Sequence, residues 1–301
     1  MPLWGIDLGG TKIEGVILES KNNPKVMIRE RIPTEAGKGY QHIIQQIVRL
    51  VELLSHKTGI KPQEIGIGTP GSVDPRTGKM KNSNSTALNG QTLFEDLSKN
   101  LKCEIKMAND ANCFALAETK MGVIYENYPE ASVVFGVIMG TGVGGGLVVN
   151  GQVINGINGI GGEWGHNFLD ESGGTCYCGK VGCVERIISG ASLEKYHQEK
   201  TGSFKKLKDI YHEHLDGSNP HSSQTIQRLI EFFGLGISVV INIVDPDAIV
   251  IGGGVGNIDL LYTKGVEEAK KHVFNPTLHT QFFKPSLGDS AGVFGAAFLS
   301  A

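Results

Sequence analysis

The stretch "LWGIDLGGTKIEGVILES" at residues 3–20 decides the fold. Apolar and polar side chains alternate on both sides of Gly9 and Gly10, as they do in two antiparallel strands joined by a glycine turn. A second stretch, "VVFGVIMGTGVGGGLVVNGQVI" at residues 133–154, repeats this order of strand, glycines and strand without a charged residue. The two stretches predict two hairpins, and their similarity suggests an internal duplication of the chain.

Shorter segments extend this pattern. "IGIGTPGSVD" at residues 65–74 and "IVIGGGVGN" at residues 249–257 each have the features of an apolar strand that runs into a glycine loop. Apolar residues recur at three-to-four spacing over residues 40–59 and again over residues 225–244, which predicts two amphipathic helices. Because strands alternate with helices, we expect an α/β protein.

Composition limits the classes of function. The chain has 301 residues, enough for two domains of ordinary size. Its 28 basic and 31 acidic side chains balance, so nothing indicates binding to nucleic acid or to an anionic membrane. One long uncharged run, residues 131–162, is rich in glycine and asparagine, which argues against a span through lipid. The first ten residues do not resemble a secretory signal, so we expect a cytoplasmic protein whose partners are small solutes.

We expect the domain boundary near Met107, where the polar "NDAN" separates the two halves. We expect an N-terminal α/β domain over residues 1–107 and a larger α/β domain over residues 108–287. The tail over residues 288–301 is rich in small side chains and predicts a short helix that packs back on the first domain.

The glycine loops suggest phosphate binding. Gly140, Gly142 and Gly145 match the dinucleotide pattern G-x-G-x-x-G, but a strand and a turn follow where that motif requires a helix. A Walker loop is excluded as well, because no lysine with serine or threonine closes either glycine run. Backbone amides of two hairpin turns could approach a triphosphate from two sides, although tight turns without a ligand explain the same glycines. Asp7 lies where a carboxylate could hold magnesium through water.

The stretch "CYCGKVGC" at residues 176–183 places three of the five cysteines within eight positions. A disulfide, a redox pair and a metal site are all open, but clustered cysteines in a reducing cytosol are more often metal ligands or catalytic groups. Two cysteines separated by one residue also make awkward disulfide geometry. Cys103 and Cys113 have no comparable neighbours, and we expect them to be ordinary core residues.

The motifs together resemble the ROK family of sugar kinases and sugar-responsive repressors. They occur in this order: "DLGGTK" (7–12), "NDAN" (109–112), "GTGVGGG" (140–146), "GEWGH" (162–166) and "CYCGKVGC" (176–183). The resemblance runs almost from end to end. It implies a two-domain actin-like, ribonuclease-H-like ATPase fold, with ATP and a hexose in an interdomain cleft that closes on binding.

The resemblance also implies the nucleotide site. ATP with Mg²⁺ would contact Asp7, Gly9, Gly10, Thr11 and Lys12 in the first hairpin, Gly140, Thr141, Gly142, Gly144 and Gly145 in the second, and Gly253 and Gly254 near the C-terminus.

The family motif assigns the role of general base to Asp110, which follows a predicted strand and begins a predicted helix. A kinase needs such a group to accept the proton of the attacking hydroxyl. A helix cap is the alternative role for this aspartate. By the same resemblance, Asn109, Glu163, His166 and Glu185 would surround the sugar with Asp110, because amides and carboxylates bind neighbouring hydroxyls well.

His166 and the three clustered cysteines supply one nitrogen and three sulfurs. Cys176, Cys178 and Cys183 with His166 would form a closed, structural Zn²⁺ site that fixes a glycine-rich loop. One ring nitrogen of His166 could bind zinc while the other faces the sugar, so the metal would orient a substrate residue.

We therefore expect an ATP-dependent hexose kinase that transfers the γ-phosphoryl group to a 6-hydroxyl. "KNSNSTALNGQTL" at residues 81–93, with "GEWGHN" and "CYCGK", resembles most closely the bacterial fructokinase or mannofructokinase branch, so fructose comes first and mannose second. The alternatives are a kinase of N-acetylglucosamine or N-acetylmannosamine, a glucokinase, and an actin-like ATPase. A sugar-sensing repressor is disfavoured because no helix-turn-helix pattern precedes the first strand. A homodimer remains open.

Overall fold

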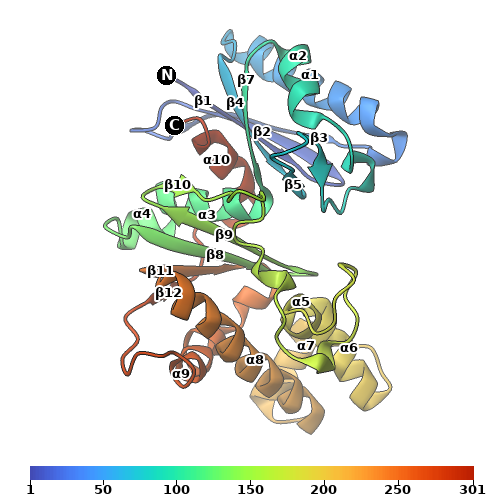
Figure 1. Ribbon diagram of the computed structural model, residues 1–301, viewed down its shortest axis with the longest axis vertical. Coiled ribbons are helices and arrows are strands. Elements are labelled where there is room, and N and C mark those ends of the chain that lie inside the picture. The colour runs from blue at the N-terminus through green and yellow to red at the C-terminus, as the bar shows by residue number, and fades with distance from the viewer. The chain divides into compact units, whose positions relative to one another are not determined.

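The computed structural model describes residues 1–301 as two compact units (Figure 1). The first comprises Met1–Glu130, Gly146–Gly161 and Ser286–Ala301, and the second comprises Ala131–Gly145 and Gly162–Pro285. Met107, near which we expect a domain boundary, lies inside the first of these units. The domains expected over residues 1–107 and 108–287 therefore stay a prediction.

The sheet of the first unit has the strand order β3-β2-β1-β4-β7. Its strands are β1 (Leu3–Leu8), β2 (Lys12–Leu18), β3 (Val26–Pro33), β4 (Glu64–Thr69) and β7 (Glu104–Asn109). β1 and β2 form the predicted antiparallel hairpin, whereas β4 runs parallel to β1 and β7 runs parallel to β4. A small sheet of β5 (Ser72–Val73) and β6 (Met80–Lys81) follows β4 in the chain.

The other five-stranded sheet repeats this topology in the order β10-β9-β8-β11-β12. Its strands are β8 (Val133–Met139), β9 (Val143–Val149), β10 (Gln152–Val153), β11 (Ala248–Gly252) and β12 (Gln281–Phe283). β11 runs parallel to β8 as β4 runs parallel to β1, and β12 runs parallel to β11. Each sheet thus contains a glycine hairpin followed by parallel strands, which supports an internal duplication.

Helix α1 (Tyr40–Thr58) packs its apolar face on the first sheet. Ile47, Leu50 and Leu54 are fully buried there, and the helix ends at Gly59 in the left-handed conformation with φ 72°. A Cβ on Gly15 of β2 would lie 2.8 Å from Leu54 Cδ1, so this glycine lets helix and sheet approach closely. The helix predicted over residues 40–59 is confirmed, and the short α2 (Leu93–Leu101) follows later in this unit.

Helices α3 (Asp110–Lys120) and α10 (Ala291–Phe298) pack against one another in the same unit, and α10 also packs on β1 and β4. The contact is between backbones. A Cβ on Gly66 would lie 1.7 Å from Ala296 O, and one on Gly295 would lie 1.7 Å from Cys113 O. The small side chains of the tail therefore allow the close contact that the sequence predicts for this helix.

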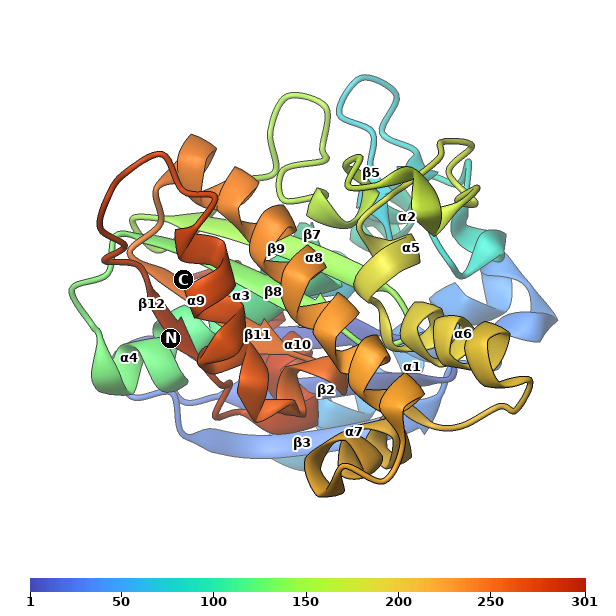
Figure 2. The same cartoon turned by 90° about the horizontal axis from the view of Figure 1, so that it is seen from below.

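The second unit contains mostly helices around its strands. These are α5 (Glu185–Ile188), α6 (Gly190–Thr201), α7 (Leu207–Asp216), α8 (Pro220–Val244) and α9 (Lys264–Lys270), while α4 (Val123–Asn127) belongs to the first unit. α8 and α9 lie side by side (Figure 2). α8 begins after the cap Asn219, whose Oδ1 accepts from His221 N at 3.0 Å, with proline at its first position. By length and composition α8 could cross a membrane, but 56% of its most apolar window is buried, as in a core helix.

Candidate functional site

Asp7 lies near the end of β1, opposite Glu14 on β2. Its carboxylate lies against Gly292 in the first turn of α10, where a Cβ would be 3.1 Å from Asp7 Oδ2. Burial raises the pKa of Asp7 to about 6, and the negative charges of Asp110 and Glu14 raise it further. A cation beside this carboxylate would favour its ionised form.

The first glycine turn joins β1 to β2 and is exposed. Gly9 N donates to Lys12 O at 3.0 Å, which closes the turn. Thr34, at the end of β3, supports it through a hydroxyl that donates to Gly9 O at 2.6 Å and an amide that donates to Thr11 O at 3.0 Å. Gly10, Thr11 and Lys12 remain solvent-exposed. The turn therefore presents backbone groups and one ammonium to solvent from a braced loop.

An ionic network around the buried Glu14 carboxylate lies beside Asp7. The Glu14 side chain is 1% exposed and forms ion pairs with Arg29 Nε at 3.2 Å and Arg31 Nε at 2.8 Å. Ser290 Oγ accepts from Arg29 at 3.0 Å and Arg31 at 3.1 Å, and it donates to Glu14 at 3.3 Å. The network ties the start of α10 to β2 and β3, and sequence analysis did not identify it.

Asp110 is the first residue of α3, and Asn109 is the residue that caps this helix. Asn109 Oδ1 accepts from Asn112 N at 2.7 Å, while Asp110 Oδ1 accepts from Ala111 N at 2.8 Å. Although solvent reaches the Asp110 side chain, the surrounding protein atoms desolvate it and raise its pKa, and the hydrogen bond from Ala111 N opposes this rise. The alternative role of a cap thus belongs to Asn109, and Asp110 keeps a basic carboxylate.

A cavity of about 220 Å³ lies within the first unit, beside the start of α3. It is lined by Thr69, Ser72, Val73, Pro75, Met107, Ala108, Asn109, Asn112, Asn155 and Gly159. The lining combines hydroxyls and amides with apolar side chains, and none of these residues carries a charge. Such a surface suits a neutral polar ligand.

The second glycine turn joins β8 to β9. Gly140 N donates to Gly142 O at 2.9 Å, and Gly190 N donates to Gly140 O at 2.7 Å. Glu185, the first residue of α5, accepts from Val143 N at 3.0 Å through Oε2. A Cβ on Gly142 would lie 2.4 Å from that oxygen, so this glycine makes room for Glu185. Glu185, expected at the sugar, therefore contacts this turn in the structure.

The "GEWGH" motif packs on β9 and α8. Glu163 precedes the 3₁₀ turn Trp164–His166. Trp164 is buried, and its Nε1 donates to Gly236 O of α8 at 3.1 Å. A Cβ on Gly165 would lie 2.0 Å from Val143 O, so only glycine allows this contact with β9. The glycines of the motif therefore bring the 3₁₀ turn against β9 and α8.

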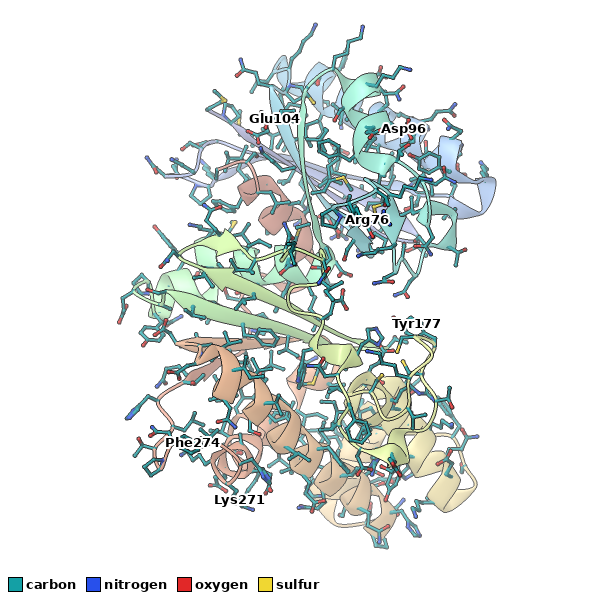
Figure 3. The ribbon with its side chains drawn as sticks, in the orientation of Figure 1. Arg76, Asp96, Glu104, Tyr177, Lys271 and Phe274 are labelled. Carbon is teal, nitrogen blue, oxygen red and sulfur yellow. The ribbon has the colours of Figure 1, made fainter.

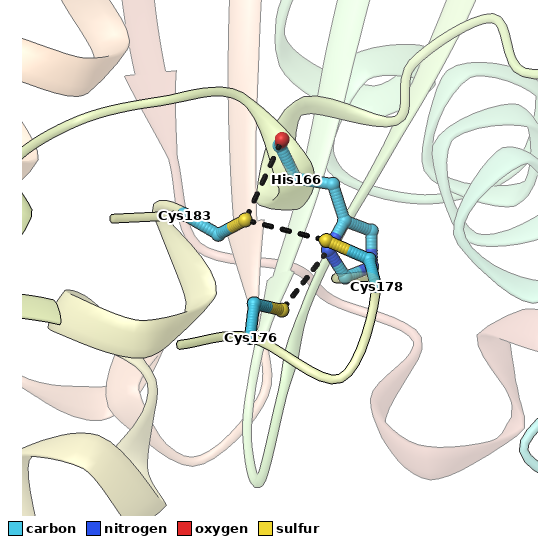
Figure 4. Close-up of side chains that lie close together, drawn as sticks. All are labelled: His166, Cys176, Cys178 and Cys183. Carbon is cyan, nitrogen blue, oxygen red and sulfur yellow. Dashed lines mark hydrogen bonds between the residues drawn. The ribbon is translucent and has the colours of Figure 1, made fainter. Parts of the chain in front are cut away.

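The predicted metal ligands lie together (Figure 4). One ligand atom each of His166, Cys176, Cys178 and Cys183 lies within 4.8 Å of all the others. His166 Nδ1 lies 3.6 Å from Cys176 Sγ, and the Sγ atoms of Cys178 and Cys183 are 3.6 Å apart. Bond lengths to Zn²⁺ at tetrahedral angles imply about 3.6 Å between nitrogen and sulfur and about 3.8 Å between sulfurs. The donor set and its spacing fit zinc.

The other ring nitrogen of His166 has a partner that sequence analysis missed. Tyr177, labelled in Figure 3, places its hydroxyl 2.9 Å from His166 Nε2, and the two rings stand edge to face with centroids 5.1 Å apart. We expected this nitrogen to face the sugar. Tyr177 lies between two of the predicted ligands in the sequence, and that position was the only available signal.

The two C-terminal glycines differ in their surroundings. Gly253 has φ +80°, and a Cβ there would lie 2.3 Å from Met139 O, so the backbone itself requires glycine. Gly254 and Gly140 have no atom within 4 Å of an added Cβ. Local packing therefore accounts for Gly253 but not for Gly254 or Gly140, whose open surroundings are compatible with the close approach of a ligand.

The expected site residues divide between the units. The first unit holds Asp7, Gly9, Gly10, Thr11, Lys12, Asn109 and Asp110, whereas the second holds Gly140, Thr141, Gly142, Gly144, Gly145, Glu163, His166, Cys176, Cys178, Cys183, Glu185, Gly253 and Gly254. Within each unit, the structure brings most of them to a glycine turn, to the start of α3 or to the metal cluster.

Known proteins are similar to this chain in sequence and in architecture. A sequence model of the ROK family matches residues 3–301. The N-acetyl-D-glucosamine kinase of Aliivibrio fischeri is 33% identical over 307 residues, which cover 99% of this chain and 98% of that protein. The kinase of the same description from Salmonella typhimurium is 32% identical over 309 residues, with 98% of both chains covered. The crystal structure of the ROK hexokinase of Thermus thermophilus superposes with a TM-score of 0.87 at 26% identity, covering 99% of this chain and 97% of that one.

Proposed function

The chain belongs to the ROK family and has its two-domain actin-like fold, and on that premise we propose that it is an ATP-dependent kinase of N-acetylglucosamine. The reaction would transfer the γ-phosphoryl group to the 6-hydroxyl of the sugar. The observation that carries the proposal is Asp110, a carboxylate with a raised pKa at the start of α3, next to a neutral polar cavity.

The proposed substrate differs from our first expectation. The motifs at residues 81–93 and 162–167 led us to place fructose first, but the similar curated relatives are N-acetylglucosamine kinases at 32–33% identity. Those relatives support the alternative that the sequence left open. Short motifs shared across a family say little about the side chains that select one hexose, and fructose remains in the test below.

Asp110 would act as the general base. Its carboxylate would accept the proton of the 6-hydroxyl while that oxygen bonds to the γ-phosphorus and the bond to the β,γ-bridging oxygen of ATP breaks. Desolvation raises the pKa of Asp110 and so makes it a stronger base than an exposed aspartate. Its hydrogen bond with Ala111 N would fix the carboxylate at the helix start.

The two glycine turns would hold the nucleotide. Residues 9–12 would present backbone amides and the Lys12 ammonium to phosphate oxygens, and residues 140–145 would do so from the second unit. Gly253 and Gly254 would let the backbone approach the adenosine. Asp7 would hold magnesium through water. When bound, Mg²⁺ neutralises charge on the phosphates, and it would also lower the pKa of Asp7 below its value of about 6 in the free protein.

The remaining predicted residues would complete the sugar site and its support. Asn109, Glu163, His166 and Glu185 would bind hydroxyls, while His166 would also join the three clustered cysteines in holding a structural zinc ion. Four protein ligands leave no open position on such a metal, so it would order the loop and take no part in phosphoryl transfer. A cytoplasmic location and small-molecule partners fit this activity.

The experiment is a coupled assay of ADP release with magnesium and ATP over N-acetylglucosamine, N-acetylmannosamine, glucose, mannose and fructose. We expect the highest kcat/KM with N-acetylglucosamine. A higher value with fructose would restore our first expectation and leave the kinase proposal intact. If no sugar stimulates ADP release, the kinase proposal is wrong.

A further inference from the structure

Tyr177 occupies the nitrogen of His166 that the proposed function assigns to the sugar. Its hydroxyl lies 2.9 Å from His166 Nε2, while the other ring nitrogen, Nδ1, lies 3.6 Å from Cys176 Sγ in the metal cluster (Figures 3 and 4). Both ring nitrogens therefore have a partner within the second unit. A sugar hydroxyl can reach His166 only where the phenol now lies.

The contact with Tyr177 excludes a second one, because a neutral imidazole has a single N–H. Nδ1 faces the cluster as a ligand atom would, so we assign the proton to Nε2. Nε2–H then donates to the hydroxyl oxygen of Tyr177. One N–H does not serve a phenol and a sugar hydroxyl equally well. The sugar either displaces the phenol or makes no contact with His166.

The pKa of Tyr177 shows which charges lie near its hydroxyl. Desolvation raises this pKa to about 12, and the negative charges of Glu185, Cys176, Glu163 and Cys178 raise it further. Glu163 and Glu185 are the two carboxylates of the second unit that we propose to bind sugar hydroxyls. The phenol thus lies near every residue of this unit to which the proposed function gives a sugar contact.

Of the two side chains in this contact, Tyr177 is the one that is free to move. Its side chain is 69% exposed, and two residues later the loop contains Gly179, at φ +86° and with open space around an added Cβ. His166 ends a 3₁₀ turn that the buried Trp164 and the close contact of Gly165 with β9 fix in place. Rotation of the phenol into solvent would free Nε2 without disturbing this turn.

We propose that the sugar binds by displacing Tyr177 from His166, so that Tyr177 is a positioning residue of the free protein and lowers its affinity for the sugar. The inference rests on the proposed kinase function and deepens it. In the free protein the phenol holds the imidazole with Nε2–H toward the sugar side. Only molecules that have released the phenol bind the sugar, so the apparent Kd rises as their fraction falls.

The test measures binding of N-acetylglucosamine by calorimetry, together with steady-state kinetics. Tyr177→Phe keeps the ring and loses the hydrogen bond. We expect Kd and KM for the sugar to fall about two- to fivefold, the lower part of the range for one net hydrogen bond, because this one is exposed. Tyr177→Ala also loses the edge-to-face contact and should show a fall at least as large. In both variants kcat and KM for ATP should stay unchanged.

Tyr125→Phe is the matched control, because it removes the hydroxyl of a tyrosine that is 57% exposed in the first unit. It should leave all constants unchanged, and elemental analysis should find equal zinc content in the wild type and every variant. If fructose proves the better substrate, the same comparison applies with fructose.

An unchanged or higher Kd in both Tyr177 variants would overturn the inference and leave the kinase proposal intact. A higher Kd together with lost zinc would show instead that Tyr177 supports the cluster, which also overturns it. A wild type that phosphorylates no sugar would overturn the proposed function and this inference with it.

Discussion

Asp7 and Asp110 are two carboxylates with raised pKa values for which we propose different roles. Both belong to the first unit, and desolvation by the surrounding protein atoms raises the pKa of each, although solvent still reaches Asp110. The charge of Asp110 contributes to the shift of Asp7, so the two carboxylates repel each other when both are ionised. A bound cation would relieve that repulsion and leave Asp110 as the group that takes a proton.

Asp110→Asn should lower kcat by roughly 10²–10⁴, because it removes a general base while keeping the shape of the side chain. The fold should be unchanged, since Asn Oδ1 can still accept from Ala111 N. Steady-state kinetics with saturating ATP and magnesium measure the effect, and calorimetry checks that the sugar still binds. The exposed Asp216→Asn serves as control. Turnover near that of the wild type would exclude Asp110 as the base.

Asp7→Asn should stabilise the free protein and abolish its magnesium-dependent activity. The pKa of Asp7 is raised from 3.8 to about 6 on folding. At about 1.4 kcal/mol for each pKa unit, and with some discount for solvent that reaches the carboxylate, ionised Asp7 costs about 1–3 kcal/mol of stability at pH 7. Because the folded pKa is the higher one, this cost is present at pH 7 and shrinks as the pH falls through 6 toward 4.

Thermal unfolding of both proteins between pH 4 and 8 measures this difference. The advantage of Asp7→Asn should be largest at neutral pH and should narrow on acidification. The proposal that ionised Asp7 destabilises the fold would be contradicted by either of two results. One is a stability gain of Asp7→Asn that does not depend on pH, and the other is a variant less stable than the wild type at pH 7.

At the scale of elements, several glycines allow close backbone contacts between neighbouring helices and strands, because a Cβ at these positions would clash. Gly66 and Gly295 bring α10 within backbone contact of β4 and α3, and Gly165 does the same for the 3₁₀ turn on β9. The contacts of α10 place its first turn against Asp7. The contact of Gly165 with β9 positions the 3₁₀ turn that carries His166. The loop that carries the Cys176, Cys178 and Cys183 cluster lacks such regular packing, and only isolated bridges join Phe168 to Cys183 and Thr175 to Val181. Its order should depend on the metal.

The purified protein should contain about one zinc ion per chain, and Cys178→Ser should lose most of it together with thermal stability. Elemental analysis and thermal unfolding with and without a chelator measure both effects. Cys103→Ser is the matched control, because Cys103 lies just before β7 in the other unit and is free. Equal zinc in the wild type and Cys178→Ser, or zinc in neither, would exclude this site.

For the whole molecule, local patterns in the sequence were sufficient to predict the two hairpins, α1, the start of α3 and the C-terminal helix. Each depends on periodicity or on a glycine turn within about twenty residues. The contacts that could not be predicted join distant positions: Glu14 with Ser290, and Glu185 with Val143. The sequence did not identify Asn109 as the cap of α3, because Asn109 and Asp110 are adjacent and both residue types are favoured at the N-cap of a helix. The preferred sugar could not be predicted, because short motifs shared across a family say little about the side chains that select one hexose.

Ligand binding should stabilise the molecule in a way that identifies the sugar independently of turnover. A ligand that binds only the folded state adds about 2.7 kcal/mol when its concentration is one hundred times its Kd. Because the unfolding entropy is about 2.1 cal/mol/K per residue, or about 0.6 kcal/mol/K for 301 residues, such a gain raises Tm by about 4 °C.

At equal concentration, N-acetylglucosamine should therefore raise Tm more than glucose or fructose, because it is the proposed substrate. Asp7→Asn should keep this response and lose most of the additional gain from a non-hydrolysable ATP analogue with magnesium, since Asp7 is proposed to act on the metal and not on the sugar. A larger shift with fructose would contradict N-acetylglucosamine as the proposed substrate. A variant that loses both responses equally would show that Asp7 supports the fold of the whole site rather than the nucleotide alone.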